Sequence, residues 1–281
     1  MKNHVVSLYD YTGEALRPWA EAGYDCYAYD IQHDPFVGTG EIYRMIEGIK
    51  YVRADLYDNN QLLEIVARHS NKAVFMSAFP PCTDLSSAGA RWWKDKEKKD
   101  PHFQQTATDH VMACSLVGRS LGAPFYIENP VGALSRLWRK YDHSFHPCDY
   151  GGYLPEDDVH PEWPDYISPR DAYRKRTCLW TGCNFEMPKP IPVEHVTVTH
   201  VRKDPKKSPR DSLVHARTGG KSLKTKNIRS ATPRGFAKAV FLANAPYSWG
   251  TKVVDGTTLS TKHYGINGVL YVEDNFTSAL Y

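Results

Sequence analysis

The 281-residue sequence contains no apolar run of the roughly 18 residues that a membrane-spanning helix requires. Its first residues, MKNHVVSLYDYTG, lack the apolar core of a secretory signal and instead resemble a strand. These absences predict a protein without membrane contact that is made and kept in a cytoplasm. Hydrophobic residues make up 41% and charged residues 24%, which suits one large α/β domain, with or without an inserted lobe.

Cysteine is scarce and scattered. The six cysteines show none of the tight spacing of disulfide-rich domains, so we expect free thiols in a reducing compartment. Three of them, Cys148, Cys178 and Cys183, leave open a zinc site completed by a nearby histidine. Their spacing fits no compact finger pattern, and no metal is our first expectation.

The net charge of +3 is small but unevenly distributed. Ten Lys and Arg and only two acidic residues lie between Arg202 and Arg229, so the rest of the chain is net acidic. Such a basic segment indicates either a polyanionic partner or a solvated loop.

Buried strands alternate with helices over the first 130 residues. Strands are predicted over 4–9, 24–32, 49–58, 72–79 and 123–130, and helices over 14–23, 60–70 and 106–122. This alternation is typical of βαβ units and predicts a mostly parallel central sheet.

The second half of the sequence is less regular. Residues 146–171 are rich in Pro, Asp, Gly and aromatic residues and predict an irregular excursion. Further strands are predicted over 175–182 and 194–201, and a helix over 232–245 with a threonine N-cap and a proline at its first position. The remaining residues, 246–281, form a polar and aromatic tail with scattered glycines.

Three aspartates, Asp10, Asp30 and Asp55, close three consecutive predicted strands. Ligands of open parallel sheets bind outside the carboxyl ends of the strands, where a carboxylate can hold ribose hydroxyls and a residue such as Gly13 lets the backbone approach. A lone aspartate after a strand is usually a turn residue, but three in order favour an adenosine-containing cofactor. The full G-x-G-x-x-G fingerprint is absent.

Cys82 and Glu128 follow two neighbouring predicted strands. Cys82 comes after two prolines that stiffen its loop, and Glu128 follows a short apolar run that should raise its pKa by desolvation. A buried structural thiol and a salt-bridged glutamate are the ordinary alternatives. Their position at strand ends instead indicates a reactive thiol beside a proton-donating carboxyl group.

The segments that carry these residues resemble those of DNA (cytosine-5) methyltransferases. FPPCTDLSSAG is similar to the proline–cysteine motif of that family, and IENP to its Glu-Asn motif, with proline where valine is usual. SLYDYTGEALRPWAEAGYDCYAYDI resembles the cofactor-binding start, with the glycine motif reduced to YDYTG. RKRTCLW resembles the arginine-bearing strand, and IRSATPRGFAKAVFLAN a late motif. The order matches over roughly residues 4–245, in a compact form similar to bacteriophage methylases, although no convincing final Gly-Asn motif is found.

The resemblance implies a Rossmann-like S-adenosylmethionine-dependent methyltransferase fold with a small irregular target-recognition lobe. The catalytic domain would comprise residues 1–145 and 229–246, the lobe residues 146–228, and the tail residues 247–281. It implies that Cys82 adds to C6 of cytosine, that Glu128 protonates N3, and that Arg176 or Arg174 contacts the base. The residues implied to hold S-adenosylmethionine are Asp10, Tyr11, Gly13, Asp30, Ile31, Asp55, Leu56 and Pro80.

The implied partner is double-stranded DNA, bound by a monomer, with the target base flipped out of the helix. The loop 83–100 would close over that base, and a plain mobile charged loop is the alternative. The residues expected to contact nucleic acid are Ser86, Ser87, Arg91, Lys94, Arg229 and Thr232.

Two other functions remain open. The short span for recognition, about 185–228, suits the same covalent chemistry on a free cytidine nucleotide, RNA or modified DNA. The weakened glycine motif suits a non-catalytic DNA-binding protein on a decayed methyltransferase scaffold.

Overall fold

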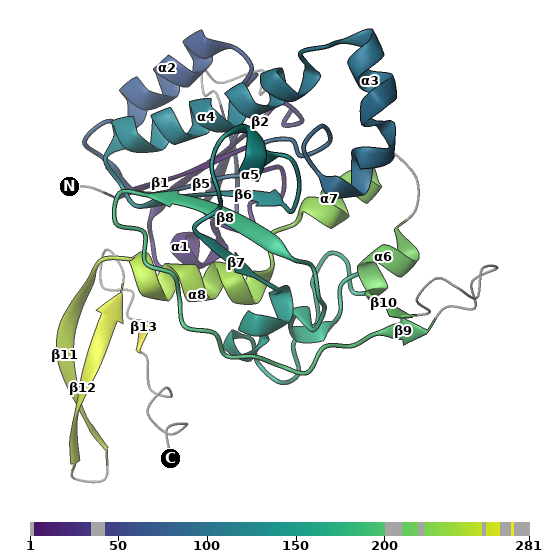
Figure 1. Cartoon of the computed structure of the whole chain (residues 1–281). Helices are drawn as coiled ribbons and strands as arrows, with labels where there is room; N and C mark the ends of the chain where they lie inside the picture. The colour runs from purple at the N-terminus through teal and green to yellow at the C-terminus, as the bar shows by residue number, and fades with distance from the viewer. Residues whose placement is uncertain are drawn as a thin grey trace.

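A computed structural model of the chain describes residues 3–34, 43–199, 210–218, 222–254, 257–264 and 271–272. Its centre is an eight-stranded sheet with the order β3-β4-β2-β1-β5-β6-β8-β7 (Figure 1). The strands are β1 His4–Leu8, β2 Asp25–Asp30, β3 Tyr43–Ile46, β4 Ile49–Arg53, β5 Ala73–Ala78, β6 Phe125–Pro130, β7 His143–Phe145 and β8 Thr177–Gly182. The strands predicted in the first 130 residues are confirmed, with shorter ends, and β3 was not predicted.

The sheet is mostly parallel. Strands β4, β2, β1, β5 and β6 run in one direction, while β3 is antiparallel to β4, and β8 is antiparallel to both β6 and β7. Counted along the chain, the parallel strands have the order 3-2-1-4-5 of a Rossmann-like sheet. The order reverses between β1 and β5, so the ligand crevice of such a fold lies outside the carboxyl ends of these two strands.

Helices cover both faces of the sheet (Figure 1). On one face lie α2 (Asn59–His69) and α4 (Phe103–Leu121), and on the other lie α1 (Arg17–Glu21) and α8 (Arg234–Asn244). The other helices are η1 Ser87–Trp92, α3 Trp93–Lys99, α5 Leu134–Leu137, η2 Pro147–Tyr153, η3 Pro169–Asp171, α6 Leu213–Arg217 and α7 Leu223–Ser230. Among the described helices, none has the length and apolarity of a membrane span.

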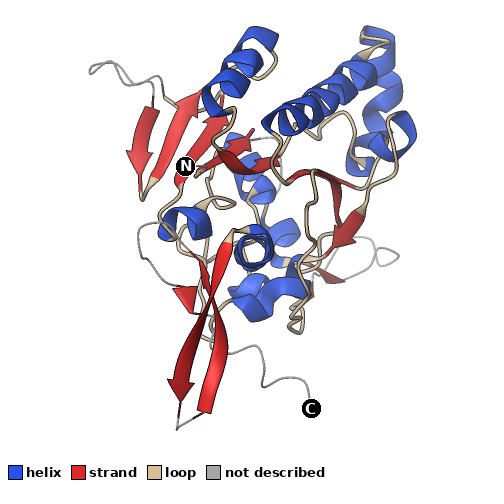
Figure 2. Cartoon of the chain, turned by 90° about the vertical axis from the view of Figure 1, so that its left-hand side faces the viewer, coloured by secondary structure: helices blue, strands red, loops and turns tan. Residues whose placement is uncertain are grey.

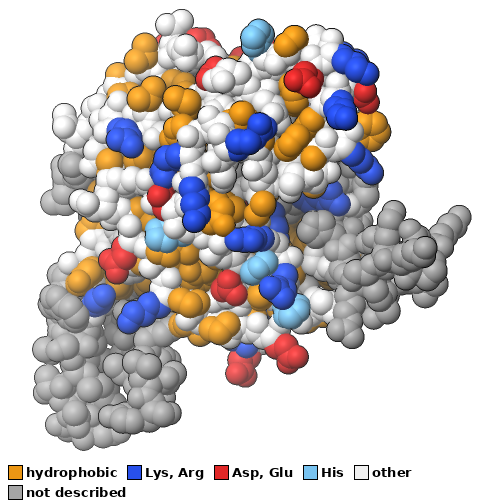
Figure 3. Space-filling view, viewed as in Figure 1, with side chains coloured by type: hydrophobic (Ala, Val, Ile, Leu, Met, Phe, Trp, Pro, Cys, Tyr) orange, Lys and Arg blue, Asp and Glu red, His pale blue; other side chains and the backbone are white. Residues whose placement is uncertain are grey.

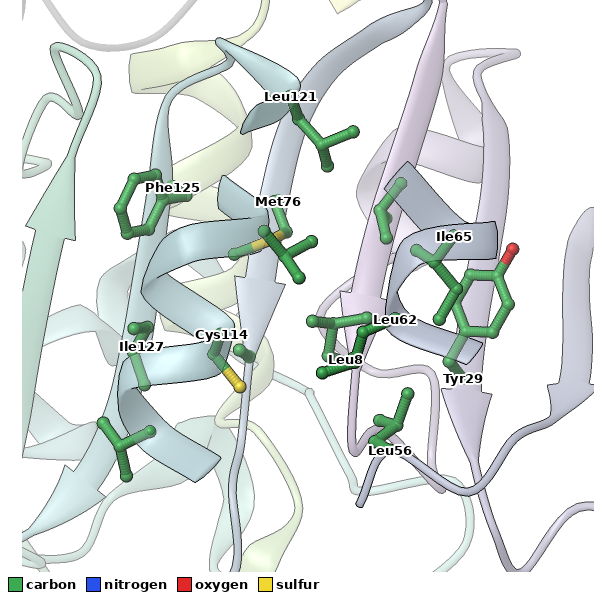
Figure 4. Close-up of a cluster of buried hydrophobic side chains, with 14 of the residues drawn as sticks. Leu8, Tyr29, Leu56, Leu62, Ile65, Met76, Cys114, Leu121, Phe125 and Ile127 are labelled. Carbon is green, nitrogen blue, oxygen red and sulfur yellow. The ribbon is translucent and has the colours of Figure 1, made fainter. Parts of the chain in front are cut away.

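Two hydrophobic cores hold these layers together. Figure 4 shows the first core, in which Leu62 and Ile65 of α2 and Cys114 of α4 meet strand residues such as Met76. In the second core, the Trp19 ring of α1 stacks on Phe75 at 4.9 Å between ring centroids. Burying each large apolar side chain of this kind contributes about 1.5–3 kcal/mol, so the sheet is a rigid platform for its strand-end loops.

Three helix predictions need correction. The helix predicted over 14–23 is reduced to α1, which starts after a turn in which the Leu16 amide donates to the Gly13 carbonyl. The predicted loop 83–100 is helical, because Ser86 caps η1 by accepting from the Ala88 amide and α3 follows at once. The N-cap of α8 is Pro233, without a side-chain cap, and the expected cap Thr232 is buried instead.

The C-terminal tail contains an unpredicted hairpin. Strands β11 (Tyr247–Val254) and β12 (Thr257–Tyr264) pair antiparallel over eight residues each, and β13 (Tyr271–Val272) pairs with β12. Figure 2 shows this hairpin projecting from the body of the molecule.

The predicted recognition lobe is not separate from the sheet, because β8 lies within residues 146–228 and pairs with β6. The segments around β8 share a small core of their own, made by Trp163, Ile167, Tyr173, Val214, Ile228 and Ala231. The strand predicted over 194–201 is reduced to β9 (Val198–Thr199), which pairs with β10 (Arg210–Asp211). Residues 200–209 and 219–221 of the basic segment lie outside the described residues.

Candidate active site at the carboxyl edge of the sheet

Cys82 and Glu128 lie on two strand ends that are tied together. The Asn129 side-chain amide at the end of β6 donates a 3.0 Å hydrogen bond to the carbonyl of Pro80 after β5. Farther along, the Ser87 amide donates to the Val131 carbonyl at 3.0 Å, and further backbone contacts continue the pairing. The two loops therefore hold the thiol and the carboxyl group in a fixed relation.

Gly132 explains how closely these loops approach. A Cβ atom at this position would lie 1.9 Å from the carbonyl oxygen of Leu85, and the Ala133 amide donates to that same oxygen at 2.7 Å. Only glycine leaves room for this contact, so the VG pair after IENP is part of the site's support.

The carboxyl group of Glu128 is buried and incompletely bonded. Its Oε1 atom has no hydrogen-bond partner among the described residues. Burial raises the pKa of Glu128, as the preceding apolar strand predicts, and the positive charge of Lys175 opposes this shift. Glu128 is therefore a carboxyl group that retains its proton closer to neutral pH than an exposed glutamate does.

The half-buried thiol of Cys82 is electrostatically coupled to Glu128. Burial raises the pKa of Cys82, the negative charge of Glu128 raises it further, and Lys175 opposes both effects. Protonation of Glu128 removes the second of these causes and so favours the thiolate. A protonated Glu128 and an ionised Cys82 therefore favour each other.

Lys175, which the sequence reasoning missed, is the cation of this site. Its Nζ donates a 2.9 Å hydrogen bond to the Arg229 carbonyl in α7. Lys175 and Glu128 line the same small cavity of about 10 Å³, together with Thr177 and Thr232. Thr232 was expected to contact nucleic acid and is instead buried in this wall.

The two arginines expected to contact the base, Arg174 and Arg176, do not line the cavity beside Glu128. Both side chains are exposed, and Arg176 donates a 2.8 Å hydrogen bond to the Tyr141 hydroxyl group. Of the described residues, those that line the cavity beside Glu128 include Lys175 but neither Arg174 nor Arg176. In the sequence the three cations are adjacent, and no local pattern separates Lys175 from Arg174 and Arg176.

Part of the predicted cofactor edge is already occupied by the protein's own contacts. The buried Asp10 carboxylate accepts from the Ser7 hydroxyl at 2.8 Å and the Gly13 amide at 2.7 Å, so it organises the turn after β1. Gly13 has a φ of +72°, but the group that approaches it is the Tyr51 hydroxyl, 2.3 Å from an added Cβ. Tyr51 therefore fills the space where a side chain at position 13 would lie, and the approach of a ligand to the Gly13 backbone stays a prediction.

The next strand ends have fewer internal hydrogen bonds, although Asp30 itself is buried. In the described part of the chain, the Asp30 carboxylate has one hydrogen-bond donor, the Gln32 amide at 2.7 Å. Asp55 accepts from the Tyr57 amide at 3.0 Å. Three large side chains stay solvent-exposed along this edge: Tyr11 at 40%, Ile31 at 50% and Tyr57 at 53%. The other two predicted cofactor residues, Leu56 and Pro80, are buried behind the edge.

The predicted nucleic-acid contacts fall into two groups. Ser86 and Ser87 are engaged within the loops, because Ser86 caps η1 and the Ser87 hydroxyl donates to the Val131 carbonyl. Arg91 and Lys94 are exposed on η1 and α3, whereas Arg229 donates to the Thr218 hydroxyl at 2.9 Å. Figure 3 shows several Lys and Arg side chains over α3 on one face of the molecule.

The cysteines left open as zinc ligands do not form such a site. Cys178 belongs to the first core, Cys183 packs at its margin, and Cys148 lies in η2. Within the ranges that the structure describes, no three His, Cys, Asp or Glu side chains gather in a way that could hold a metal ion.

The chain was compared with protein-family models and with curated proteins. The chain matches no protein-family model and no curated protein.

Proposed function

We propose that the chain transfers a methyl group from S-adenosylmethionine to C5 of cytosine in DNA. One observation carries the proposal: a thiol and a buried, incompletely bonded carboxyl group end adjacent parallel strands on loops tied by the Asn129–Pro80 hydrogen bond. A nucleophile beside a proton donor is the pair that addition to a pyrimidine ring needs.

Cytosine is activated in this proposal by two residues at once. As the Cys82 sulfur bonds to C6, the C5–C6 π electrons shift toward C5, and the Glu128 proton moves to N3. C5 then has the character of an enamine carbon. Once C5 carries the methyl group, loss of the C5 proton and cleavage of the S–C6 bond restore the ring and release Cys82. The coupling between Glu128 and Cys82 suits this exchange, because each group favours the reactive form of the other.

The edge formed by β1, β2 and β4 suits the adenosine part of the cofactor. Asp30 offers a carboxylate oxygen to ribose hydroxyls, and Tyr11, Ile31 and Tyr57 offer exposed apolar surface to a purine ring. When bound, S-adenosylmethionine supplies an electrophilic methyl group. This edge adjoins the crevice between β1 and β5, and Cys82 follows the second of these strands.

DNA is the proposed substrate because of what surrounds the thiol. The exposed side chains of Arg91 and Lys94 lie on the helices that directly follow the Cys82 loop, in reach of a phosphate backbone. A base stacked inside a duplex cannot reach a half-buried thiol, so the proposal requires base flipping.

The decisive test is transfer of labelled methyl groups from S-adenosylmethionine to three substrates. These are cytosine-containing duplex DNA, RNA of the same sequence and free cytidine monophosphate. We expect label in the duplex alone, in 5-methylcytosine after digestion. Label in RNA alone or in the nucleotide alone would support the same covalent chemistry on a substrate other than duplex DNA.

A non-catalytic DNA-binding protein is the second candidate. It is favoured by the contact between Tyr51 and Gly13, which narrows the cofactor edge, and by the raised pKa of Cys82. Duplex binding in a mobility-shift assay without binding of labelled S-adenosylmethionine would decide for this candidate.

A further inference from the structure

A larger pocket, of about 580 Å³, opens beside the cofactor edge. Its walls come from Tyr11 after β1, from the segment 162–166, and from α7. We propose that this pocket binds a nucleoside, with an amino-bearing base such as adenine or cytosine among its aromatic side chains. The volume lies in the range of small-molecule sites. The assignment to nucleosides rests on the lining alone and does not require methyl transfer.

The aromatic side chains of the pocket are held in place. Trp163 is buried in the small core of the lobe, and its backbone amide donates to His160 Nδ1 at 3.1 Å. The exposed ring of Tyr11 is nearly parallel to that of His33, with centroids 5.8 Å apart and planes inclined by 14°. Rigid aromatic surfaces bind bases by stacking at low entropic cost, whichever base is present.

The polar groups around these rings select for nucleosides. Glu162 and Asp165 are exposed on the lining and can accept from an exocyclic amino group, as acidic side chains do from cytosine N4. Lys224 Nζ lies 5.4 Å from the centroid of the Tyr166 ring and brings a cation for a phosphate or carboxylate group. These charged groups on the lining favour a polar ligand over a purely apolar one.

Asn227 joins the pocket to the strand ends. Its side-chain amide, nearly buried, donates to Gln32 Oε1 at 3.3 Å, which ties α7 to the loop after β2. The pocket therefore spans the boundary between the sheet and the lobe. Its nucleoside can come from two sources: the adenosine half of a cofactor, or an unstacked base of a nucleic acid that lies along the lobe.

The test measures binding by isothermal titration calorimetry with four probes: adenosine, S-adenosylmethionine, inosine and a short oligodeoxycytidine. We expect adenosine to bind at least about tenfold more tightly than inosine, which lacks the amino group. Tyr166→Ala and the surface variant Lys224→Ala should each weaken binding of the phosphate- or carboxylate-bearing probe. Lys72→Ala, the same change at an exposed lysine just before β5, at the amino ends of the strands, should leave every affinity unchanged.

The probes separate the two sources. Binding of S-adenosylmethionine that Tyr166→Ala weakens roughly tenfold, with no oligonucleotide effect, assigns the pocket to the cofactor. The reverse pattern assigns it to the nucleic acid. Equal affinity of wild type and both pocket variants for every probe, in folded protein by circular dichroism, would overturn the proposal. A Cys82→Ala variant should bind all four probes as wild type does. Binding in the pocket and methyl transfer are therefore tested independently, and one proposal can fail without the other.

Discussion

The two ends of the central sheet both contain buried ionisable groups, but these groups differ in how completely they are hydrogen-bonded. At the amino ends of the strands, His4 and His69 share a 2.9 Å hydrogen bond, and His69 is also bonded to the Tyr29 hydroxyl at 2.7 Å. Lys50 lies in the same region and pairs with Asp25 at 2.9 Å. At the carboxyl ends, Glu128 Oε1 and Asn129 Oδ1 are buried without partners among the described residues.

This difference separates a structural network from a candidate site. A buried polar atom without a partner costs about 1–3 kcal/mol, so folding alone gives no reason to keep two of them on adjacent residues. A ligand that bonds to them would give such a reason. The amino-end network needs no ligand, because each of its named side chains already has a partner.

The largest expected effect is that of Cys82→Ala. Without the sulfur nucleophile, methyl transfer to duplex DNA should fall by about a thousandfold or more, while the melting temperature and cofactor binding stay close to those of wild type. Cys114→Ala is the matched control, since Cys114 is a free thiol buried in the first core. It should lower stability and leave the activity of the folded protein intact. Normal turnover by Cys82→Ala would refute the proposed reaction.

Glu128→Gln should have the next largest effect. The amide keeps the shape of the side chain but cannot pass a proton to N3, so the rate should fall by about a hundred- to ten-thousandfold. Stability should not fall, because no ionised carboxyl group is then buried. The matching variant at the amino ends of the strands is Tyr29→Phe, which removes the hydrogen bond to His69. That variant should lose about 1 kcal/mol in denaturant unfolding and retain full activity.

Lys175→Met and Arg176→Met form a sharper pair, because the two residues are adjacent in sequence. Lys175 opposes the upward shifts in the pKa of both Cys82 and Glu128, so its removal should raise both pKa values further. The alkaline pKa that governs formation of the thiolate in the pH–rate profile should move upward, with a roughly tenfold loss of rate at neutral pH. Arg176→Met, which loses a surface bond to Tyr141, should leave the profile in place. Equal profiles for both variants would remove Lys175 from the site.

The sequence was sufficient to find the groups that end apolar strands. Cys82 and Glu128 each follow a run of buried residues, and parallel strands bring such ends to one edge whatever the details of packing. Lys175 was missed because RKRTC contains three adjacent cations, and only the folded structure shows that Lys175 is the one that lines the cavity beside Glu128. Tyr51 closes on Gly13 from another strand, a long-range contact that no local pattern encodes.

The hairpin β11–β12 was also absent from the prediction, but for a different reason. The sequence VVDGTT contains an Asp-Gly pair between two runs rich in Thr, Val and Tyr, which is a strong hairpin signal. That signal is local in the sequence, whereas the helices η1 and α3 within 83–100 are anchored in part by a long-range contact, the Ser87 hydroxyl to the Val131 carbonyl 44 residues away.

The smallest expected effect tests the amino-end network through pH. Burial, and then the charge of His4 and neighbouring cations, lowers the pKa of His69 to about 3, below its unfolded value of 6.5. The folded state therefore resists a proton that the unfolded chain accepts. The stabilisation is complete above pH 6.5 and is lost as the pH falls toward 3.

Urea unfolding at a series of pH values measures this dependence. Between about pH 6.5 and pH 4.5 the free energy of unfolding should fall by on the order of 2 kcal/mol through this histidine. His69→Leu should start lower at neutral pH, because Tyr29 and His4 lose a partner, and should depend less on pH over this range. The rate of methyl transfer by the folded variant should match wild type. A loss of activity as large as that of Lys175→Met would mean that the two ends of the sheet are coupled and that the division drawn between them is wrong.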